Sequence, residues 1–293
     1  MIKRTVEISS GAAHLSLRLK QLSVKREGED EVTVPLEDLG ILVISHPNVS
    51  ITNALLAECA SQNITVVFCD MKHKPSGAML PFSGHSTQAE TMEAQIAASQ
   101  PVKKRIWQYI IEAKIAGQAK ALEACSGKGK ALFEMAKQVK SGDTENMEAR
   151  AAQYYWPRLF GKDFRRDREG GPPNSILNYG YTVIRASVAR ALVGSGLHPS
   201  LGVHHRNRYD SFRLADDAME PLRPIVDIKA FELWKANPEV EVEKETKRAM
   251  LEILGMDLRF NGEKEPFMEA MAHYAASLRR AIAEGAPLTI PEW

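Results

Sequence analysis

The chain is organised around residues 199–227, which read PSLGVHHRNRYDSFRLADDAMEPLRPIVD. This stretch holds two adjacent histidines and, beyond a short polar linker, three carboxylates: His204, His205, Asp216, Asp217 and Glu220. If the second half is helical, Asp217 and Glu220 share one face, and so do Asp216 and Glu220. Imidazole and carboxylate together suit Mg²⁺, Mn²⁺ or a related ion. The stretch therefore predicts part of a divalent metal site.

The same residues have a plainer interpretation. Arg213 and Arg223 lie near the carboxylates in the sequence, so the acidic residues could simply form ion pairs on a solvated helix face. Structural ion pairs also gather carboxylates, and two adjacent histidines are a weak signal alone. Spacing by itself therefore favours ion pairs over a metal site.

The composition describes an ordinary globular protein. The 293 residues are 44% hydrophobic and 26% charged, which is enough chain for one large or two ordinary domains. No apolar run approaches the roughly 20 residues of a membrane span, and the N-terminus lacks the apolar core of a signal peptide. Three widely spaced cysteines predict reduced thiols and a cytoplasmic protein: Cys59, Cys69 and Cys125. A net charge of +1 means that any DNA binding must come from local basic patches.

Residues 1–80 are predicted to form a small β-rich domain with one helix. Alternating polar and apolar residues predict half-buried antiparallel strands at three places: residues 5–8, 15–19 and 22–25. Two continuous apolar runs predict buried strands, and two short segments are further candidates: residues 41–44, 64–68, 32–34 and 49–51. Thr52 or Asn53 can cap a short helix that ends near Ser61.

Residues 81–293 are predicted to be almost entirely helical, which makes the fold class α+β. Helix-forming residues at helical spacing predict seven helices: residues 86–99, 101–125, 130–139, 145–160, 175–195, 240–254 and 264–284. A turn is expected at Asn261–Gly262. Residues 162–171 are charged and end in glycine, so we expect an exposed, mobile loop there.

Other motifs are less specific. Gly127 to Lys130 is too short for a phosphate-binding loop and is interpreted as a turn. The aromatic residues at 154–156 could stack on bases, but an aromatic cluster on a helix is more often part of the core. A basic run at 103–105 is usually a solvated face, with phosphate contact as the alternative.

Four motifs, in order, carry a resemblance to a known family: EARAA followed by YYW (148–156), LNYGY (177–181), GLHPSLGVHH (196–205) and LADDAMEPLRP (214–224). The chain resembles the CRISPR-associated integrases that acquire spacers, the founding and most widespread Cas proteins. The last two motifs are similar to those of Cas9-containing (type II) systems. Each motif alone is weak, but four in the right order and spacing are specific. The resemblance covers essentially the whole chain.

The resemblance implies a divalent metal, Mg²⁺ or Mn²⁺, held by Glu148, His205 and the acidic motif. Many relatives present an aspartate pair in that motif, whereas this sequence offers Asp217 and Glu220. We expect Glu148, His205 and Glu220 to be the catalytic ligands, with Asp217 as a neighbouring or alternate ligand. His204 then becomes a structural or DNA-side neighbour.

The implied reaction is insertion of short foreign DNA into a CRISPR array, by attack of a 3′-hydroxyl on a phosphodiester at the repeat border. The implied partners are double-stranded DNA with 3′-hydroxyl ends, CRISPR leader-repeat DNA, a second copy of the chain and the small ferredoxin-like adaptation protein. Residues 1–80 would dimerise and residues 81–293 would be catalytic. Charge alone suggests the DNA-binding residues: Lys103, Lys104, Arg105, Arg165, Arg166 and Arg168. The alternatives are a stand-alone nuclease for branched DNA in repair and a non-catalytic DNA-binding scaffold.

Overall fold

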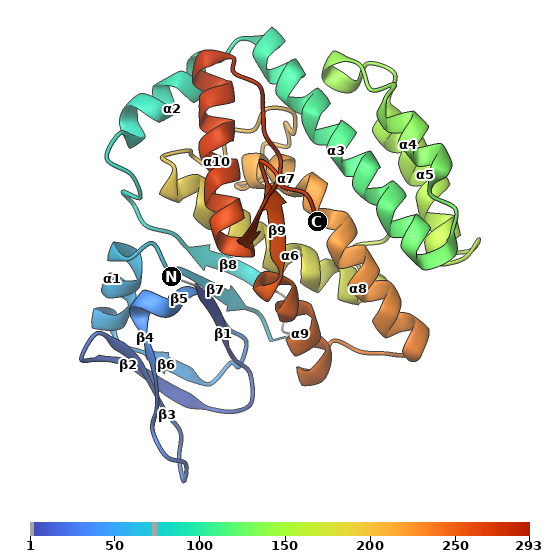
Figure 1. Ribbon diagram of the computed structural model, residues 1–293. Helices are drawn as coiled ribbons and strands as arrows, with labels where there is room; N and C mark the ends of the chain where they lie inside the picture. Colours follow the sequence, from blue (N-terminus) through green and yellow to red (C-terminus); the bar gives the residue numbers. More distant parts are fainter. Residues whose placement is uncertain (1–2, 72–74) are drawn as a thin grey trace.

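The N-terminal quarter of the chain is β-rich and the remainder is mostly helical, as predicted (Figure 1). A computed structural model describes residues 3–71 and 75–293. Two four-stranded sheets lie together at the lower left of Figure 1, and the helices fill the rest of the molecule. The fold class is therefore α+β.

The first sheet has the strand order β1-β5-β7-β8. Its strands are β1 (Arg4–Ile8), β5 (Leu39–Ile44), β7 (Thr65–Cys69) and β8 (Pro75–Met79). Strands β1, β5 and β7 run parallel, and only β8 is antiparallel. The prediction of an antiparallel strand at residues 5–8 is therefore wrong. Alternation reports which face of a strand is buried, but it carries no information on the direction of the partner strand.

Strand β5 is apolar throughout because both of its faces are covered. Ile41 and Val43 join the hydrophobic core of the helical part, whereas Leu42 and Ile44 join a separate core beneath the second sheet. The first sheet is thus the layer between the two cores. It ties the β-rich region to the helices that carry the site.

The second sheet has the order β4-β3-β2-β6. Its strands are β2 (Ala13–Arg18), β3 (Gln21–Lys25), β4 (Val32–Pro35) and β6 (Val49–Ile51). The β2-β3-β4 meander is antiparallel, as predicted, and β6 adds in parallel beside β2. Helix α1 (Asn53–Ser61) begins after Thr52, whose hydroxyl accepts the Leu55 N–H at 3.4 Å. This confirms the predicted cap.

Helix α3 (Gln100–Ser126) is a long helix that crosses the helical part of the molecule in Figure 1. It packs against α4, α5, α8 and α10. Pro101 lies in its first turn and Gly127 follows its end with φ +66°, both favoured positions. The other helices are α2 (Gln88–Ala97), α4 (Lys130–Ala136), α5 (Met147–Leu159), α6 (Asn174–Gly194), α7 (Arg213–Met219), α8 (Arg223–Ala236), α9 (Lys244–Leu251) and α10 (Phe267–Glu284). Four short 3-10 turns also occur: η1 (Leu36–Asp38), η2 (Ser141–Asp143), η3 (Glu220–Leu222) and η4 (Glu252–Gly255).

Two elements depart from the predicted pattern. Helix α8 was not indicated by the sequence, because Pro221 and Pro224 obscure its start, although proline is tolerated in a first helical turn. The strands β9 (Asp257–Phe260) and β10 (Glu263–Pro266) form a hairpin where residues 264–266 were expected to be helical. The predicted turn is present, with positive φ at Asn261 and Gly262.

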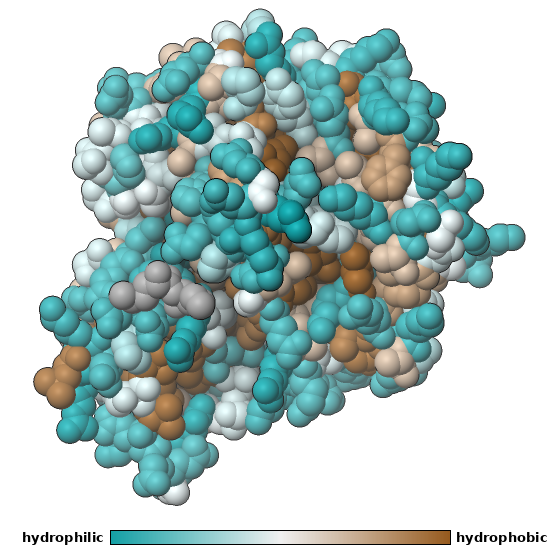
Figure 2. All heavy atoms as spheres, in the orientation of Figure 1, coloured by the Kyte–Doolittle hydropathy of each residue, from teal (hydrophilic) through white to brown (hydrophobic). Residues whose placement is uncertain are grey.

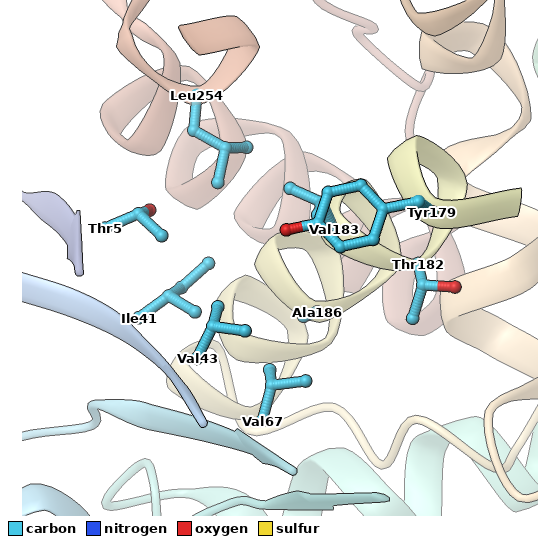
Figure 3. Close-up of a pocket in the computed structure, with 9 residues that line it drawn as sticks. All are labelled: Thr5, Ile41, Val43, Val67, Tyr179, Thr182, Val183, Ala186 and Leu254. Atoms are coloured by element: carbon cyan, nitrogen blue, oxygen red, sulfur yellow. The ribbon is translucent and has the colours of Figure 1, made fainter. Parts of the chain in front are cut away.

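The first sheet and α6 pack closely. The space between them is a cavity of about 10 Å³, lined by residues that include Thr5 and Val43 of the sheet and Tyr179 and Val183 of the helix (Figure 3). A cavity of this size holds about one water molecule at most. The division of the chain into domains near residue 80 stays a prediction. In the described part of the chain, no helix combines the length and hydropathy of a membrane span.

Candidate active site

Two glutamates from different elements meet at a lysine of α3. Glu148 lies in the first turn of α5, and Glu220 is the first residue of η3. The Lys114 ammonium lies 2.6 Å from Glu148 Oε1 and 2.6 Å from Glu220 Oε2. Arg223 donates its Nε–H to Glu220 Oε1 at 2.9 Å. The fold therefore brings together the two glutamates singled out in the sequence, and adds two cations around them.

Glu220 is a buried, fully ionised carboxylate. Its side chain is only 4% exposed. Burial disfavours the charged form, but Arg223 and Lys114 outweigh it and hold the pKa of Glu220 at about 2. Burial likewise opposes the charge on Lys114, yet Glu220 and Glu148 together raise the pKa of that amine. Glu220 and Lys114 are thus both charged at neutral pH.

Asp217 organises the turn that carries the two histidines. It is fully buried on α7, and its carboxylate accepts backbone N–H groups from Val203 at 2.7 Å, His204 at 3.0 Å and His205 at 3.1 Å. The same carboxylate accepts the Nδ1–H of His205 at 2.5 Å. A Cβ at Gly202 would lie 3.0 Å from Asp217 Oδ2, so the turn is built to fit closely around this side chain.

The Asp217 contact defines which nitrogen of His205 remains available. Since the carboxylate is an acceptor, Nδ1 carries the proton and Nε2 is left for another partner. The hydrogen bond to Asp217 raises the pKa of His205, against an opposing effect of burial. The charge of Glu220 also raises it, which indicates that the histidine turn and the glutamates belong to one electrostatic cluster.

The Trp107 ring of α3 packs against the imidazoles of both His204 and His205. Its ring stacks on His204 with 4.0 Å between ring centroids and 2° between planes, and it meets the edge of His205 at 5.8 Å. Trp107 itself is almost completely buried. Burial lowers the pKa of His204. Helix α3 therefore contributes two residues to this cluster, Trp107 and Lys114.

A third buried carboxylate, Asp227, lies near Arg223. Asp227 of α8 accepts the hydroxyl of Tyr155 at 3.0 Å and also that of Tyr181. The Arg223 guanidinium lies 4.5 Å from the centre of the Tyr181 ring. Burial raises the pKa of Asp227 to about 6, and the two hydroxyls partly oppose it. Tyr155 is fully buried, which supports the core interpretation of the aromatic cluster over base stacking.

Asp216 does not join Glu220. Its carboxylate lies 3.7 Å from Arg185, and burial first, then Asp210, raises its pKa to about 6. Asp216 thus pairs with Arg185, whereas Glu220 pairs with Lys114 and Arg223. The alternative to a metal site was ion pairs on a solvated helix face. It is correct that Glu220 forms an ion pair, but that pair is buried and not solvated. Arg213 is not its partner and donates to Ser200 O at 2.9 Å.

The donors present suit a divalent ion, although they are not arranged around an open site. Within residues 3–71 and 75–293, no three His, Cys, Asp or Glu side chains already form a cation-binding cluster. Lys114 lies between the two glutamates instead. Among the described atoms, Glu220 Oε2 has this ion pair but accepts no hydrogen bond. Two carboxylates and an imidazole nitrogen are a donor set that Mg²⁺ or Mn²⁺ accepts.

The basic residues proposed for DNA fall into two groups. Lys103, Lys104 and Arg105 lie on the first turns of α3 and are at least partly exposed. At about 1.5 Å per residue, Lys114 is roughly 14 to 17 Å farther along the helix. The run therefore lies apart from the carboxylates, at the end of α3 where its side chains reach solvent.

The loop arginines of the second group, Arg165, Arg166 and Arg168, differ in their contacts. Arg166 donates to Asn174 Oδ1 at 3.0 Å and to Asn178 Oδ1 at 2.6 Å, and Asn178 returns a bond to the Arg168 carbonyl at 2.8 Å. The loop is thereby tied to the start of α6. Arg165 and Arg168 are exposed, whereas Arg166 is half-buried by these contacts.

No motif in the sequence points to Lys114 or Trp107, although the spacing around the lysine carries a signal. The residues three and four positions away from Lys114 lie on the same face of the helix. Three of them are buried: Ile110, Ile111 and Gln118. A lysine on the buried stripe of a helix needs a partner, because an unpaired buried charge is costly. Only the fold reveals that the partners are Glu148 and Glu220.

Known proteins resemble this chain over most of its length. The sequence model of the family described as CRISPR associated protein Cas1 matches residues 6–252. The chain belongs to the Cas1 family. The CRISPR-associated endonuclease Cas1 of Neisseria meningitidis serogroup C (strain 8013) is 39% identical over 237 residues, covering 80% of this chain and 77% of the relative.

Solved structures show that this Cas1 chain has a known fold. A casposase bound to integration product has a TM-score of 0.79 at 19% identity, over 97% of this chain and 91% of the casposase. A Cas6-RT-Cas1–Cas2 complex has a TM-score of 0.76 at 17% identity, over 97% of this chain and 35% of that one. At these identities the likeness establishes the fold alone.

Proposed function

We propose that the chain is a metal-dependent DNA endonuclease and integrase that inserts short DNA segments into a CRISPR array. In this reaction a 3′-hydroxyl attacks a phosphodiester at the repeat border. Membership of the Cas1 family and a relative named as an endonuclease support the general activity. The observation that carries the proposal is the convergence of Glu148 and Glu220, with His205 electrostatically coupled to Glu220.

In this proposal Glu148, His205 Nε2 and Glu220 hold Mg²⁺ or Mn²⁺. Asp217 would act through His205, because it fixes the ring through Nδ1 as carboxylates behind ligating histidines do. A bound divalent ion would favour ionisation of the attacking hydroxyl and stabilise charge at the phosphorus. The side chains of Glu148 and His205 are 29% and 39% exposed, so a phosphodiester could approach from their side, with Glu220 beneath.

The proposed partners follow the same family membership. They are double-stranded DNA with 3′-hydroxyl ends, CRISPR leader-repeat DNA, a second copy of the chain and the small ferredoxin-like adaptation protein. Among structures of this fold, one complex contains Cas2 and one casposase is bound to integration product. The residues proposed to contact DNA phosphates are the half-buried Lys103 and the exposed Lys104, Arg105, Arg165 and Arg168.

Three single substitutions test the proposed site: Glu148→Ala, His205→Ala and Glu220→Ala. Each protein would be assayed for joining a 3′-hydroxyl duplex into a repeat substrate with Mg²⁺ or Mn²⁺, and for thermal unfolding. We expect joining to fall to background in each while the protein still folds. Glu134→Ala removes an exposed glutamate of α4 and serves as the matched control.

Three results would redirect the proposal. If all three variants still join DNA, metal catalysis by these residues is wrong. If the wild type neither binds Mn²⁺ or Mg²⁺ nor joins DNA, the non-catalytic scaffold should replace the proposal. If the wild type cuts bare branched junctions as well as it joins DNA into a leader-repeat, without any partner, the stand-alone repair nuclease is favoured. A substrate panel containing both kinds of DNA distinguishes these outcomes.

A further inference from the structure

Lys114 lies where the two glutamates need a shared cation. Its ammonium is 2.6 Å from one oxygen of Glu148 and 2.6 Å from one oxygen of Glu220. The lysine side chain is 12% exposed, and it lies on α3 between the buried residues Ile111 and Ile115. Its position is thus defined by the core of the protein and by the two carboxylates together.

The charges around this point already balance. Glu148 and Glu220 contribute two negative charges, and Lys114 and Arg223 contribute two positive charges at ion-pair distance. A divalent ion placed between the same carboxylates would add two positive charges beside an ammonium. Like charges a few ångströms apart repel, and partial burial weakens the screening by water, so the ammonium and the ion would disfavour each other.

We infer that Lys114 is a built-in competitor of the divalent ion. In the metal-free protein it holds Glu148 and Glu220 together, and it must leave the position between them for the ion to bind. The ion would therefore bind weakly to the protein alone and more tightly once DNA supplies phosphate charge. This inference rests on the proposed metal site and concerns how that site is filled.

The chemistry of lysine suits such a role better than that of arginine. The lysine ammonium ends a flexible four-carbon stem, so it can swing away from the carboxylates without disturbing α3. Arg223, in contrast, is held between Glu220 and the ring of Tyr181. Of the two cations beside Glu220, Lys114 is the one that can be displaced and could then pair with a DNA phosphate.

Calorimetric titration with Mn²⁺ tests the inference without using activity. Metal-free wild type, Lys114→Met and Lys114→Arg would be titrated alone and with a short 3′-hydroxyl duplex. We expect Lys114→Met to bind Mn²⁺ at least about tenfold more tightly than wild type without DNA. Lys114→Arg should not gain affinity, and the duplex should strengthen binding more in wild type than in Lys114→Met. Equal or weaker binding by Lys114→Met would overturn the inference.

A variant of a ligand separates this result from the proposed function. Glu148→Gln should lose Mn²⁺ affinity if the metal site is right. If Glu148→Gln binds as wild type does, the proposed site itself fails. If Glu148→Gln loses affinity and Lys114→Met does not gain it, the site stands and only the competition is wrong.

Amine labelling of wild type provides a second measurement, which remains decisive if Lys114→Met does not fold. The protein would be treated with an acylating reagent with and without Mn²⁺ and duplex, and each lysine quantified by mass spectrometry. We expect labelling of Lys114 to rise severalfold on addition of Mn²⁺ alone. Lys137, an exposed lysine of the α4 end, should label equally in both samples. Unchanged labelling of Lys114 under saturating Mn²⁺ would refute displacement.

Discussion

Asp217 is the side chain on which the histidine turn depends. Its two buried oxygens accept three consecutive backbone N–H groups and the His205 ring. Glu220, three residues later, instead receives Lys114 and Arg223. Two acidic residues of one motif therefore have different partners, which is why their variants should behave differently.

The first prediction concerns Asp217→Ala. Removing the carboxylate leaves three backbone N–H groups without their acceptor, and each unsatisfied buried group costs about 1–3 kcal/mol. We expect a clear loss of stability in urea unfolding, together with reduced but measurable DNA joining. Asp217→Asn retains an acceptor oxygen and should lose less. If Asp217→Ala unfolds at the same urea concentration as wild type, Asp217 does not stabilise the turn.

The second prediction concerns pH and Asp227. Its pKa is raised from 3.8 to about 6 in the folded protein, so the native state binds this proton more tightly than the unfolded chain. The corresponding stability is fully present below pH 3.8 and is lost as the pH rises past 6. Asp227→Asn stays neutral throughout.

Unfolding free energies measured from pH 3.5 to 7.5 check this prediction. Relative to wild type, Asp227→Asn should gain roughly 2 to 3 kcal/mol across that range. Asp163→Asn, a change at an exposed loop position, should run parallel to wild type. Parallel curves for Asp227→Asn as well would show that the pKa of Asp227 does not differ between the native and unfolded states.

Single residues could be predicted where a motif named them. The motifs point to Glu148, His205 and Glu220, and the structure joins the two glutamates through Lys114. The role of all three as ligands stays a prediction. Lys114 and Trp107 belong to no motif, and their partners are distant in the sequence. Pairing between α3 and the histidine turn follows from tertiary packing, which local spacing does not encode.

At the scale of elements, the loop at 162–171 behaves as an extension of α6. Arg166 ties it to Asn174 and Asn178, which are contacts that its composition did not indicate. Mixed charge and glycine indicate exposure, but they cannot reveal hydrogen bonds to a helix ten residues away. The three loop arginines should therefore have unequal roles.

The third prediction distinguishes these arginines by the salt dependence of DNA binding. Arg165→Ala and Arg168→Ala should each lower the slope of log affinity against log salt by roughly 0.7 to 0.9 if they contact phosphates. Replacing all three loop arginines should flatten the slope further and weaken all sequences about equally. Arg166→Ala should mainly lower the melting temperature, because its guanidinium bonds within the protein. If the slope is unchanged in all variants, DNA phosphates do not contact this loop.

Helical periodicity predicted most helices because long buried stripes are a strong local signal. The failures have physical causes that are equally specific. Strand β1 was assigned the wrong direction because its partner, β5, lies more than thirty residues away. Residues 264–266 look helical by composition, yet the Asn261–Gly262 turn pairs them with residues 257–260. In each case a contact between segments overrode the local pattern.

At the scale of the whole molecule, the second sheet has unpaired edges and exposed apolar side chains in the described chain. Its edges are β4 and β6, and neither is paired beyond the sheet in the described chain. Leu19 at the β2–β3 turn is 87% exposed, and Val32 of β4 is 54% exposed. Figure 2 shows brown apolar side chains among the teal polar ones at the lower left, where this sheet lies. Exposed strand edges with apolar side chains favour pairing with another chain.

The last prediction is that residues 1–80 build a homodimer through this sheet. Light scattering at micromolar concentration should give twice the mass of one chain. Leu19→Asp and Val32→Asp place a charge on the exposed apolar surface, so both should shift the protein towards monomer while leaving its circular dichroism unchanged. Ile96→Asp alters an equally exposed apolar residue on α2, 68% exposed, and should remain dimeric. A wild-type monomer would refute the dimer, whereas dissociation by Ile96→Asp alone would place the interface on the helical part.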